Sequence, residues 1–339
     1  MLKSIRPLFK VCFLILPVCV LAQTQDTVRK RFADGITKEK LRIVLTRIAS
    51  DEMEGRESGK RGQKIAADYI SLQFKSLGLQ PAVNDTGYFQ SFPLDKDKQN
   101  TAWSENVLGY IEGSDLKTEL IVISAHYDHL GIRAGHIFNG ADDDGSGTAA
   151  VIELAAAFSM AQKQGYGPRR SLLFLLFSGE EKGLLGSEFY VEHPVYPLTS
   201  TVADLNIDMI GRIDDRHKES PDSAGYVYVI GSDKMSLELH RINEEANSGY
   251  CKLSLDYTYN SKDDPHHYYY RSDQYNFVKQ GIPVIFYFNG THADYHRETD
   301  RTDKINFELL CKRTRLVFLT AWELAARNDR IKTDGKNEN

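Results

Sequence analysis

The sequence predicts an α/β fold in a single domain, with a central mixed, mostly parallel sheet and helices on both faces. Two observations indicate this class. From Asn106 onward, short apolar runs alternate with longer amphipathic segments, which is the pattern of strands joined by helices. The 339-residue chain also has no internal repeat and no linker rich in proline or serine that would mark a second domain. With 41% hydrophobic residues, it can bury a substantial core.

Five apolar runs are expected to form strands, because each is short, apolar and bounded by polar residues. They cover residues 120–124, 172–177, 202–207, 226–230 and 283–288. Two insertions are expected between these elements. Residues 214–225 form a polar loop, and residues 253–270, rich in Tyr, Asp and His, should lie near the active edge of the sheet.

Helices are expected where apolar residues recur at helical spacing. They cover residues 41–48, 62–77, 148–162 and 305–326. In the second helix, Ile65, Tyr69 and Leu72 mark the apolar side, and Gly78 stands where a helix ends on a residue of positive φ. Ser146 is the expected N-cap of the third helix.

Residues 1–22 are typical of a secretory signal peptide. Lys3, Arg6 and Lys10 precede an apolar run, and cleavage is expected before Gln23. The mature domain would then be residues 23–339, exported to the periplasm or secreted, with no membrane span. A lipoprotein anchored through Cys19 is the alternative. The net charge of -5 gives no reason to expect a nucleic-acid partner.

The mature chain would keep two cysteines, Cys251 and Cys311. Two thiols cannot form a zinc–thiolate cage. The sequence allows either a disulfide between them or a pair of buried free thiols.

The side chains that suggest chemistry come directly after the expected strands. In open α/β sheets, sites form outside the carboxyl ends of the strands, so these distant segments should converge. In chain order these side chains are His126, Asp128, Glu180, Glu181, Asp208 and His296.

Three adjacent carboxylates, Asp142, Asp143 and Asp144, stand in a glycine-rich segment before the third helix. Their mutual repulsion would be relieved by a cation, and one carboxylate can bridge two ions with its two oxygens. A calcium loop is the alternative, but the EF-hand spacing is absent.

The adjacent acids Glu180 and Glu181 follow a very apolar run. At the end of a buried strand they would suffer desolvation and mutual repulsion. One could ligate a metal while the other, with a raised pKa, accepts a proton from a metal-bound water. An exposed loop with both acids solvated is the alternative.

The number of candidate ligands predicts a metal pair. Two imidazoles and three carboxylates, one of them bridging, give each of two zinc ions three protein ligands and room for a shared water. Calcium would require more oxygen ligands and no imidazole. Two Zn²⁺ ions per chain are therefore expected, with cobalt or manganese as alternatives.

These residues resemble the M28 family of zinc aminopeptidases, in order and in spacing, over nearly all of the mature chain. The resemblance implies a zinc peptidase without a protease-associated insert that removes residues from peptides with a free N-terminus. The matching segments are residues 53–56, 126–128, 140–147, 180–187, Asp208 with Gly211, 272–273, 281–283 and 295–300.

The resemblance also implies which residues bind each ion. One zinc would be held by His126 and Asp208, and the other by Glu181 and His296. A substrate amino group would be attracted to the acidic cleft around them.

The bridging ligand would be Asp143, because the family's bridging residue stands three before a serine, here Ser146. Asp142 is the alternative if that register is wrong.

Three further roles follow from the resemblance. Glu180 would be the general base and then the general acid, and Asp128 would orient His126. Tyr269, three before the Ser-Asp pair, would help to stabilise the transition state. The metal-ligand pattern shows no departure from the family.

Other functions remain open on the same scaffold. The family resemblance also includes glutaminyl cyclases, which usually work with one zinc, as well as carboxypeptidases and dipeptidases. A non-catalytic binding module that keeps the metal only for its structure is a further alternative.

Overall fold

The structure, a computed structural model, describes residues 26–84, 87–98, 101–220 and 225–335. The expected signal peptide, residues 1–22, lies outside these ranges. None of the helices in the described ranges is long and apolar enough to cross a lipid bilayer.

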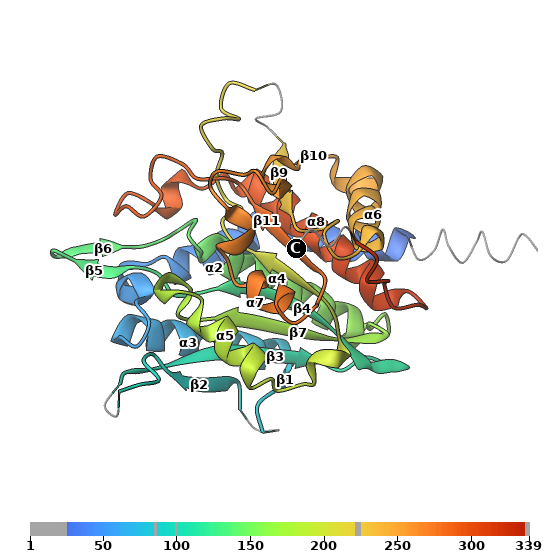
Figure 1. Cartoon of the computed structure of the whole chain (residues 1–339), viewed down its shortest axis with the longest axis horizontal. Helices are drawn as coiled ribbons and strands as arrows, with labels where there is room; N and C mark the ends of the chain where they lie inside the picture. The colour runs from blue at the N-terminus through green and yellow to red at the C-terminus, as the bar shows by residue number, and fades with distance from the viewer. Residues whose placement is uncertain (1–25, 85–86, 99–100, 221–224, 336–339) are drawn as a thin grey trace, which may run out of the picture.

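A nine-stranded mixed sheet forms the centre of the molecule, in the order β1-β3-β7-β4-β8-β11-β9-β10, with β2 paired to β3 (Figure 1). The four central strands, β7, β4, β8 and β11, run parallel. Antiparallel pairs join β3 to β7 and β9 to β11. The strands are Gln80–Pro81 (β1), Phe89–Pro93 (β2), Trp103–Ile111 (β3), Leu116–His126 (β4), Arg170–Phe177 (β7), Thr201–Ile207 (β8), Tyr226–Ile230 (β9), Ser254–Asp256 (β10) and Val284–Phe288 (β11).

Helices cover both faces of this sheet, so the expected fold class is confirmed. A small hairpin of Gly131–Arg133 (β5) and His136–Phe138 (β6) projects from the molecule (Figure 1). Residues 26–34 are also helical. The α-helices that follow are Lys38–Ile48 (α2), Arg61–Leu77 (α3), Gly145–Lys163 (α4), Leu185–Glu192 (α5), Leu237–Ala246 (α6), Gln274–Val278 (α7) and Phe307–Ala326 (α8).

Strand alternation divides the core into two layers. On one face of β4, Ile121 and Ile123 pack in the main core with α4 and α8. On the other face, Val122 packs in a smaller core with Tyr190 of α5 and Phe277 of α7. In Figure 1, α5 and α7 lie in front of the sheet. This two-sided burial explains why the central strands read as continuous apolar runs.

All five expected strands are present, and the four expected helices are present with slightly different ends. Strands β1, β2, β3 and β10 and the β5–β6 hairpin were not predicted from the sequence. Strand β3 escaped notice because polar residues interrupt it. One of them, Asn106, is buried and donates from Nδ2 to the carbonyl of Gly186 (2.8 Å) and to Oε1 of Gln90 (3.0 Å).

Two details of the helices were wrong. Asp144, not Ser146, caps α4, because its side chain accepts from the N–H of Gly147. The buried side of α3 is formed by Ala66, Ala67, Ile70 and Phe74, whereas Leu72 is 61% exposed. Gly78 does end α3 with a φ of 84°.

The cysteines are not paired. Cys251 and Cys311 are both free thiols, the former half-buried and the latter buried. Burial raises the pKa of the Cys251 thiol to about 12, which keeps it protonated.

Candidate active site

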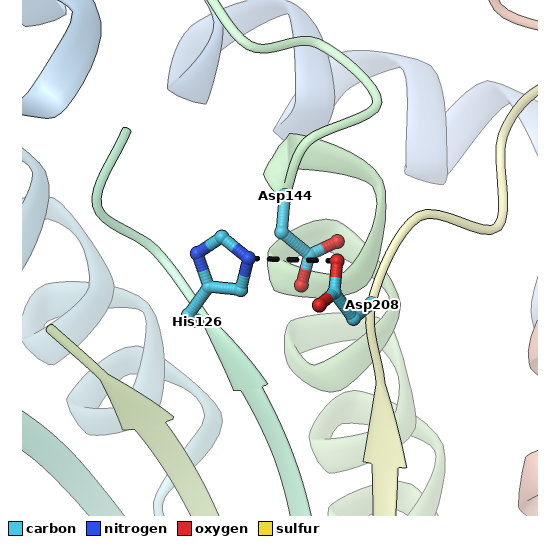
Figure 2. Close-up of side chains that lie close together, drawn as sticks. All are labelled: His126, Asp144 and Asp208. Atoms are coloured by element: carbon cyan, nitrogen blue, oxygen red, sulfur yellow. Dashed lines mark ion pairs between the residues drawn. The ribbon is translucent and has the colours of Figure 1, made fainter. Parts of the chain in front are cut away.

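The carboxyl ends of four parallel strands meet at one edge of the sheet, and the expected site residues lie there. His126 is the last residue of β4, and Asp208 follows β8 directly. The aspartate segment precedes α4 and reaches the same edge, where Asp144 faces both (Figure 2). The parallel topology therefore brings together residues that are distant in the sequence.

Asp143 lies between the two candidate imidazoles. Its Oδ1 is 3.4 Å from Nε2 of His126, and its Oδ2 is 3.0 Å from Nε2 of His296. The side chain is buried, with 4% of its surface exposed. One carboxylate thus presents one oxygen to each imidazole, which is the geometry that a bridging ligand requires.

Asp142 has a different environment. Its Oδ1 accepts from the N–H of Gly211 at 2.7 Å, and its Oδ2 lies 3.2 Å from Nε2 of His292. Of the two aspartates weighed as a bridge, only Asp143 contacts both His126 and His296.

Asp208 and Glu181 each lie beside one of these two imidazoles. Oδ1 of Asp208 is 3.5 Å from Nε2 of His126, and its Oδ2 accepts from the hydroxyl of Ser272 at 2.7 Å. Oε2 of Glu181 is 3.3 Å from Nε2 of His296. The five expected metal ligands are therefore in one cluster, arranged as two groups that share Asp143.

A third imidazole, His129, belongs to this cluster and was missed from the sequence. It is buried, and its Nδ1 lies 2.8 Å from Oε1 of Glu181 and 3.7 Å from Oδ2 of Asp143. Its position three residues after His126, just beyond the same strand, was the available signal.

Glu180 and Asp128 flank the cluster. Oε2 of Glu180 is 3.9 Å from Nε2 of His126. Asp128 contacts His126 through its backbone carbonyl, 3.2 Å from Nδ1, and more weakly through Oδ1 at 3.7 Å. Its carboxylate also accepts from the hydroxyl of Ser58 at 2.5 Å and from the N–H of Glu180 at 3.2 Å. Asp128 therefore contacts both a candidate ligand and the candidate base.

The surroundings of the two adjacent glutamates shift their pKa values in opposite directions. Burial raises the pKa of Glu180 well above its usual range, and the charges of Asp208 and Glu181 add to the rise. Burial also pushes the pKa of Glu181 upward, but contacts with His129 and His296 hold it at about 2. Such a divergence suits one carboxylate to proton transfer and the other to binding a cation.

The imidazoles show that the cluster attracts positive charge. Burial lowers the pKa of His296, but its contacts with Asp143 and Glu181 prevail and set it at about 10. The pKa of His126 is likewise raised well above its usual range, because Glu180 and Asp208 outweigh burial. A divalent cation would supply this charge and leave the imidazoles neutral as ligands.

Buried atoms without hydrogen-bond partners point to the same cation. Unpartnered buried polar atoms are costly unless a ligand satisfies them. Mixed imidazole and carboxylate donors fit zinc better than calcium or magnesium. Two sets of donors, His126 with Asp144 and Asp208, and His129 with Asp143 and Glu181, each lie within 4.8 Å of one another. In the described part of the chain, several buried atoms of these two sets make no hydrogen bond, although His129 Nδ1 and Glu181 Oε1 approach to 2.8 Å as an ion pair. They are Nε2 of His126, both ring nitrogens of His129, Oδ2 of Asp143, Oδ2 of Asp144 and Oε1 of Glu181.

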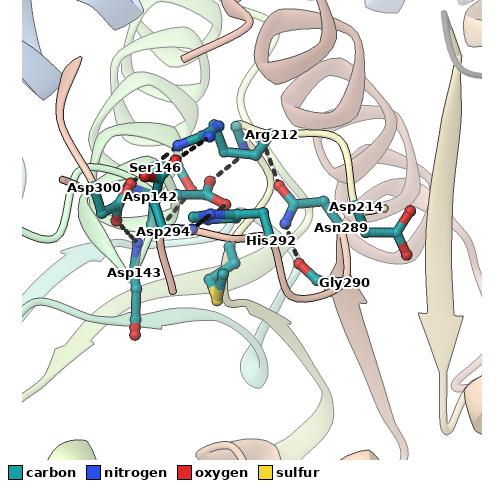
Figure 3. A network of polar contacts seen from close by, with 12 residues as sticks. Asp142, Asp143, Ser146, Arg212, Asp214, Asn289, Gly290, His292, Asp294 and Asp300 are labelled. Atoms are coloured by element: carbon teal, nitrogen blue, oxygen red, sulfur yellow. Dashed lines mark hydrogen bonds and ion pairs between the residues drawn. The ribbon is translucent and has the colours of Figure 1, made fainter. Parts of the chain in front are cut away.

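A polar network fixes the aspartate loop from outside the cluster (Figure 3). Oδ2 of Asp300 accepts from the N–H groups of Asp142 (2.9 Å) and Asp143 (3.2 Å). Arg212 in turn contacts Oδ1 of Asp300 at 3.4 Å and Oδ2 of Asp294 at 2.7 Å. These bonds hold the backbone of the loop and so fix where Asp143 points.

Arg56 holds the same loop from inside the protein. Its guanidinium is fully buried and donates to the carbonyls of Gly140 (2.9 Å) and Asn139 (2.6 Å) in the loop. It also donates to the carbonyls of Tyr127 (2.7 Å) and Ile48 (2.9 Å). Burial lowers the pKa of Arg56 to about 10, against the opposing charge of Asp143, so it stays positive beneath the acids.

Tyr269, expected to stabilise a transition state, does not line the cleft. Its ring packs against the ring of Tyr275, with the ammonium of Lys234 5.0 Å from its centroid. Residues Tyr268–Tyr270 form one 3₁₀ turn, so their side chains point in three different directions. Tyr268 is the one that lines the cleft, together with Tyr295.

Fold and cluster together define an α/β protein with a carboxylate and imidazole centre at the carboxyl edge of its sheet. The chain belongs to Peptidase family M28, whose profile matches residues 106–321. It is 29% identical over 261 residues to "Leupeptin-inactivating enzyme 1" of Streptomyces exfoliatus, covering 77% of this chain and 50% of that relative. The chain therefore spans about half the length of this relative.

Solved structures share the fold. The LapA aminopeptidase of Legionella pneumophila superposes with a TM-score of 0.68 at 20% identity, over 96% of this chain and 79% of that one. BSAP, a zinc aminopeptidase from Bacillus subtilis, superposes with a TM-score of 0.66 at 17% identity. The match covers 89% of this chain and 99% of BSAP. A glutaminyl cyclase of Porphyromonas gingivalis superposes with a TM-score of 0.61 at 18% identity. The match covers 84% of this chain and 98% of the cyclase. The fold alone therefore does not choose between peptidase and cyclase.

Proposed function

We propose that this protein is a zinc-dependent aminopeptidase that binds two Zn²⁺ ions. His126 and Asp208 would hold one ion, and Glu181 and His296 the other. The observation that carries the proposal is the position of Asp143, whose two oxygens face the two imidazoles at 3.4 and 3.0 Å. Membership in Peptidase family M28 supports the reaction class.

The proposed chemistry divides between metal and protein. Bound zinc supplies the Lewis acidity that polarises a scissile carbonyl and acidifies water. Glu180 receives the proton on its carboxylate and returns it to the leaving amine, a role that its raised pKa favours. Asp128 positions both Glu180 and His126. Its carboxylate accepts from the N–H of Glu180, and its backbone carbonyl contacts the ring of His126.

The acidic character of the cleft supports action at the N-terminus. Its lining includes Asp143, Glu180 and Asp208. A protonated α-amino group is attracted to these carboxylates, whereas a free C-terminal carboxylate placed there would be repelled. This favours an aminopeptidase over a carboxypeptidase.

A substrate panel tests the proposal. The protein is stripped with a chelator, dialysed, and assayed with and without added zinc. We expect zinc-dependent release of the first residue from unblocked peptides, and none from N-acetylated peptides. Cyclisation of N-terminal glutamine by a protein with one zinc would favour a glutaminyl cyclase. Release of C-terminal residues would favour a carboxypeptidase, and cleavage confined to dipeptides a dipeptidase. A metal-bound protein without any of these activities would be a binding module.

We also propose export, with cleavage before Gln23, from the charged and apolar pattern of residues 1–22. N-terminal sequencing of protein recovered from the medium or periplasm tests this. A mature chain that begins at Gln23 is the expected result, and a lipid-modified Cys19 would replace the proposal with a lipoprotein.

A further inference from the structure

One wall of the cleft is aromatic and apolar. Met209, Phe286 and Phe288 line it beside Tyr268 and Tyr295, and Asp143, Glu180 and Asp208 line the same cleft. The three apolar side chains are buried in a core cluster of their own together with Tyr268. The cleft therefore combines the carboxylates of the cluster with apolar side chains that are packed in the core.

A single cation interrupts this lining. Arg271 is the only lysine or arginine among the described residues that line the cleft. Its guanidinium lies 4.9 Å from the ring centroid of Tyr268, and its Nη2 donates to the hydroxyl of Tyr295 at 3.4 Å. Two tyrosines thus hold an exposed side chain that is otherwise very flexible.

Arg271 differs in its charge balance from Arg212, which also lies near the cluster. Arg212 is neutralised by Asp294 and Asp300. In the described part of the chain, no carboxylate lies within ion-pair distance of Arg271. Its guanidinium has five N–H donors, of which one is used by Tyr295. The remaining donors are open to an external anion.

Arg271 is also close to the reacting centre. The ring of Tyr295, whose hydroxyl it contacts, stacks on the ring of His296 with centroids 3.9 Å apart. His296 in turn contacts Asp143. The side chain of Tyr295 therefore links Arg271 to His296 at the edge of the proposed metal-binding cluster.

We propose that Arg271 binds a carboxylate on the leaving-group side of the scissile bond, and that the preferred substrates are short or acidic peptides. The inference rests on the proposed aminopeptidase function. A peptide whose amino group is bound by Asp143, Glu180 or Asp208 would extend its leaving portion along the same cleft, where a carboxylate would meet the guanidinium. Arginine pairs with carboxylates through two parallel hydrogen bonds, which suits this recognition.

Two substrate pairs distinguish the possible sources of the carboxylate. Leu-Gly against Leu-Gly-amide tests a C-terminal carboxylate, and Leu-Glu-amide against Leu-Gln-amide tests an acidic side chain. With the full, zinc-loaded chain, we expect kcat/KM to favour the carboxylate member of at least one pair by about tenfold or more, mainly through KM. Equal kcat/KM values within both pairs would overturn the inference.

Variants of Arg271 test whether it causes the preference. Arg271→Met should reduce the ratio within the preferred pair to near one, and Arg271→Lys should retain part of it, since lysine keeps the charge but not the paired donors. Lys279→Met is the matched control. Its ammonium also lies over a tyrosine ring, that of Tyr275 at 5.1 Å, but outside the cleft. This control should keep the wild-type ratio.

The failures of the two proposals are distinguishable. If the wild type hydrolyses none of the four substrates with zinc, the aminopeptidase proposal fails. If the wild type hydrolyses them with a preference that persists in both Arg271 variants, aminopeptidase function stands and Arg271 is not the carboxylate site. A thermal midpoint for each variant excludes misfolding as the cause of a changed ratio.

Discussion

Oδ1 of Asp128 accepts a hydrogen bond from the backbone N–H of Glu180 at 3.2 Å. The backbone carbonyl of Asp128 lies 3.2 Å from Nδ1 of His126. Its second carboxylate oxygen accepts from Ser58 at 2.5 Å, which fixes the side chain in place. Asp128, two positions after the end of β4, thus helps to position both a proposed metal ligand and the proposed base.

Replacing Asp128 with Asn tests this coupling. The amide keeps the shape of the side chain but removes its charge, so the N–H of Glu180 and the hydroxyl of Ser58 lose a strong acceptor. We expect kcat to fall about 10- to 100-fold, with weaker zinc affinity. Steady-state kinetics and a zinc titration measure both effects. Asp97→Asn, on an exposed loop, is the control and should behave as the wild type. Unchanged kcat in Asp128→Asn would mean that Asp128 only shapes the fold.

Glu180→Gln removes the proposed proton acceptor without changing its size. We expect kcat to fall about 10²- to 10⁴-fold while zinc content stays at the wild-type level, because Glu180 is not a proposed ligand. Metal analysis of the purified variant accompanies the kinetics. Glu188→Gln on α5, a half-exposed position outside the cleft, serves as the control. Full activity in Glu180→Gln would remove Glu180 from the mechanism.

Arg56→Met should destabilise the protein strongly. The substitution leaves the carbonyls of Ile48, Tyr127, Asn139 and Gly140 without their donor in the interior. Removing one partner of such a buried charged network costs about 3–5 kcal/mol in the free energy of unfolding. Urea denaturation measures the change. Arg61→Met removes an exposed arginine paired with Glu54 and should cost under about 1 kcal/mol. Equal stability of the two variants would show that Arg56 does not support the loop.

Asp204 predicts a pH dependence of stability. Burial in β8 raises its pKa from 3.8 to about 8, although its Oδ1 accepts from Ser124 at 2.7 Å. Between about pH 4 and pH 8 the folded state holds a proton that the unfolded chain has released. The contribution of this carboxyl to stability therefore falls as pH rises through that window and is level above it.

Asp204→Asn removes this titration. Relative to wild type, the variant should gain stability as pH increases from 4 to 8, by an amount on the order of a few kcal/mol. Urea denaturation at several pH values measures the difference. Asp215→Asn, at an exposed position, should show no such trend. A constant difference between Asp204→Asn and wild type across this range would refute the assigned protonation.

Much of the fold could be predicted because its central strands are buried on both faces. Runs such as Leu172–Phe177 are short and apolar throughout, so they are readily recognised as buried strands. Strand β3 could not be found in this way, because the burial of Asn106 depends on hydrogen bonds to residues far along the chain. The N-terminus of α4 was misplaced for a similar reason. Both Asp144 and Ser146 are good capping residues, and the choice between them depends on tertiary contacts.

The candidate site was predictable where its residues follow strands. The parallel topology brings His126, Asp208 and the aspartate segment together, whatever their separation in sequence. Side-chain direction was not predictable: among three consecutive tyrosines, only the observed 3₁₀ turn places Tyr268 rather than Tyr269 in the cleft. His129 was overlooked because its contact with Glu181 arises from packing at the strand end.

The most direct test of this account is anomalous diffraction at the zinc absorption edge from crystals of the zinc-loaded protein. We predict two anomalous peaks, one on each side of the Asp143 carboxylate, the first beside His126 and Asp208 and the second beside Glu181 and His296. A single peak, or peaks away from Asp143, would contradict the bridged zinc pair on which the proposed function rests.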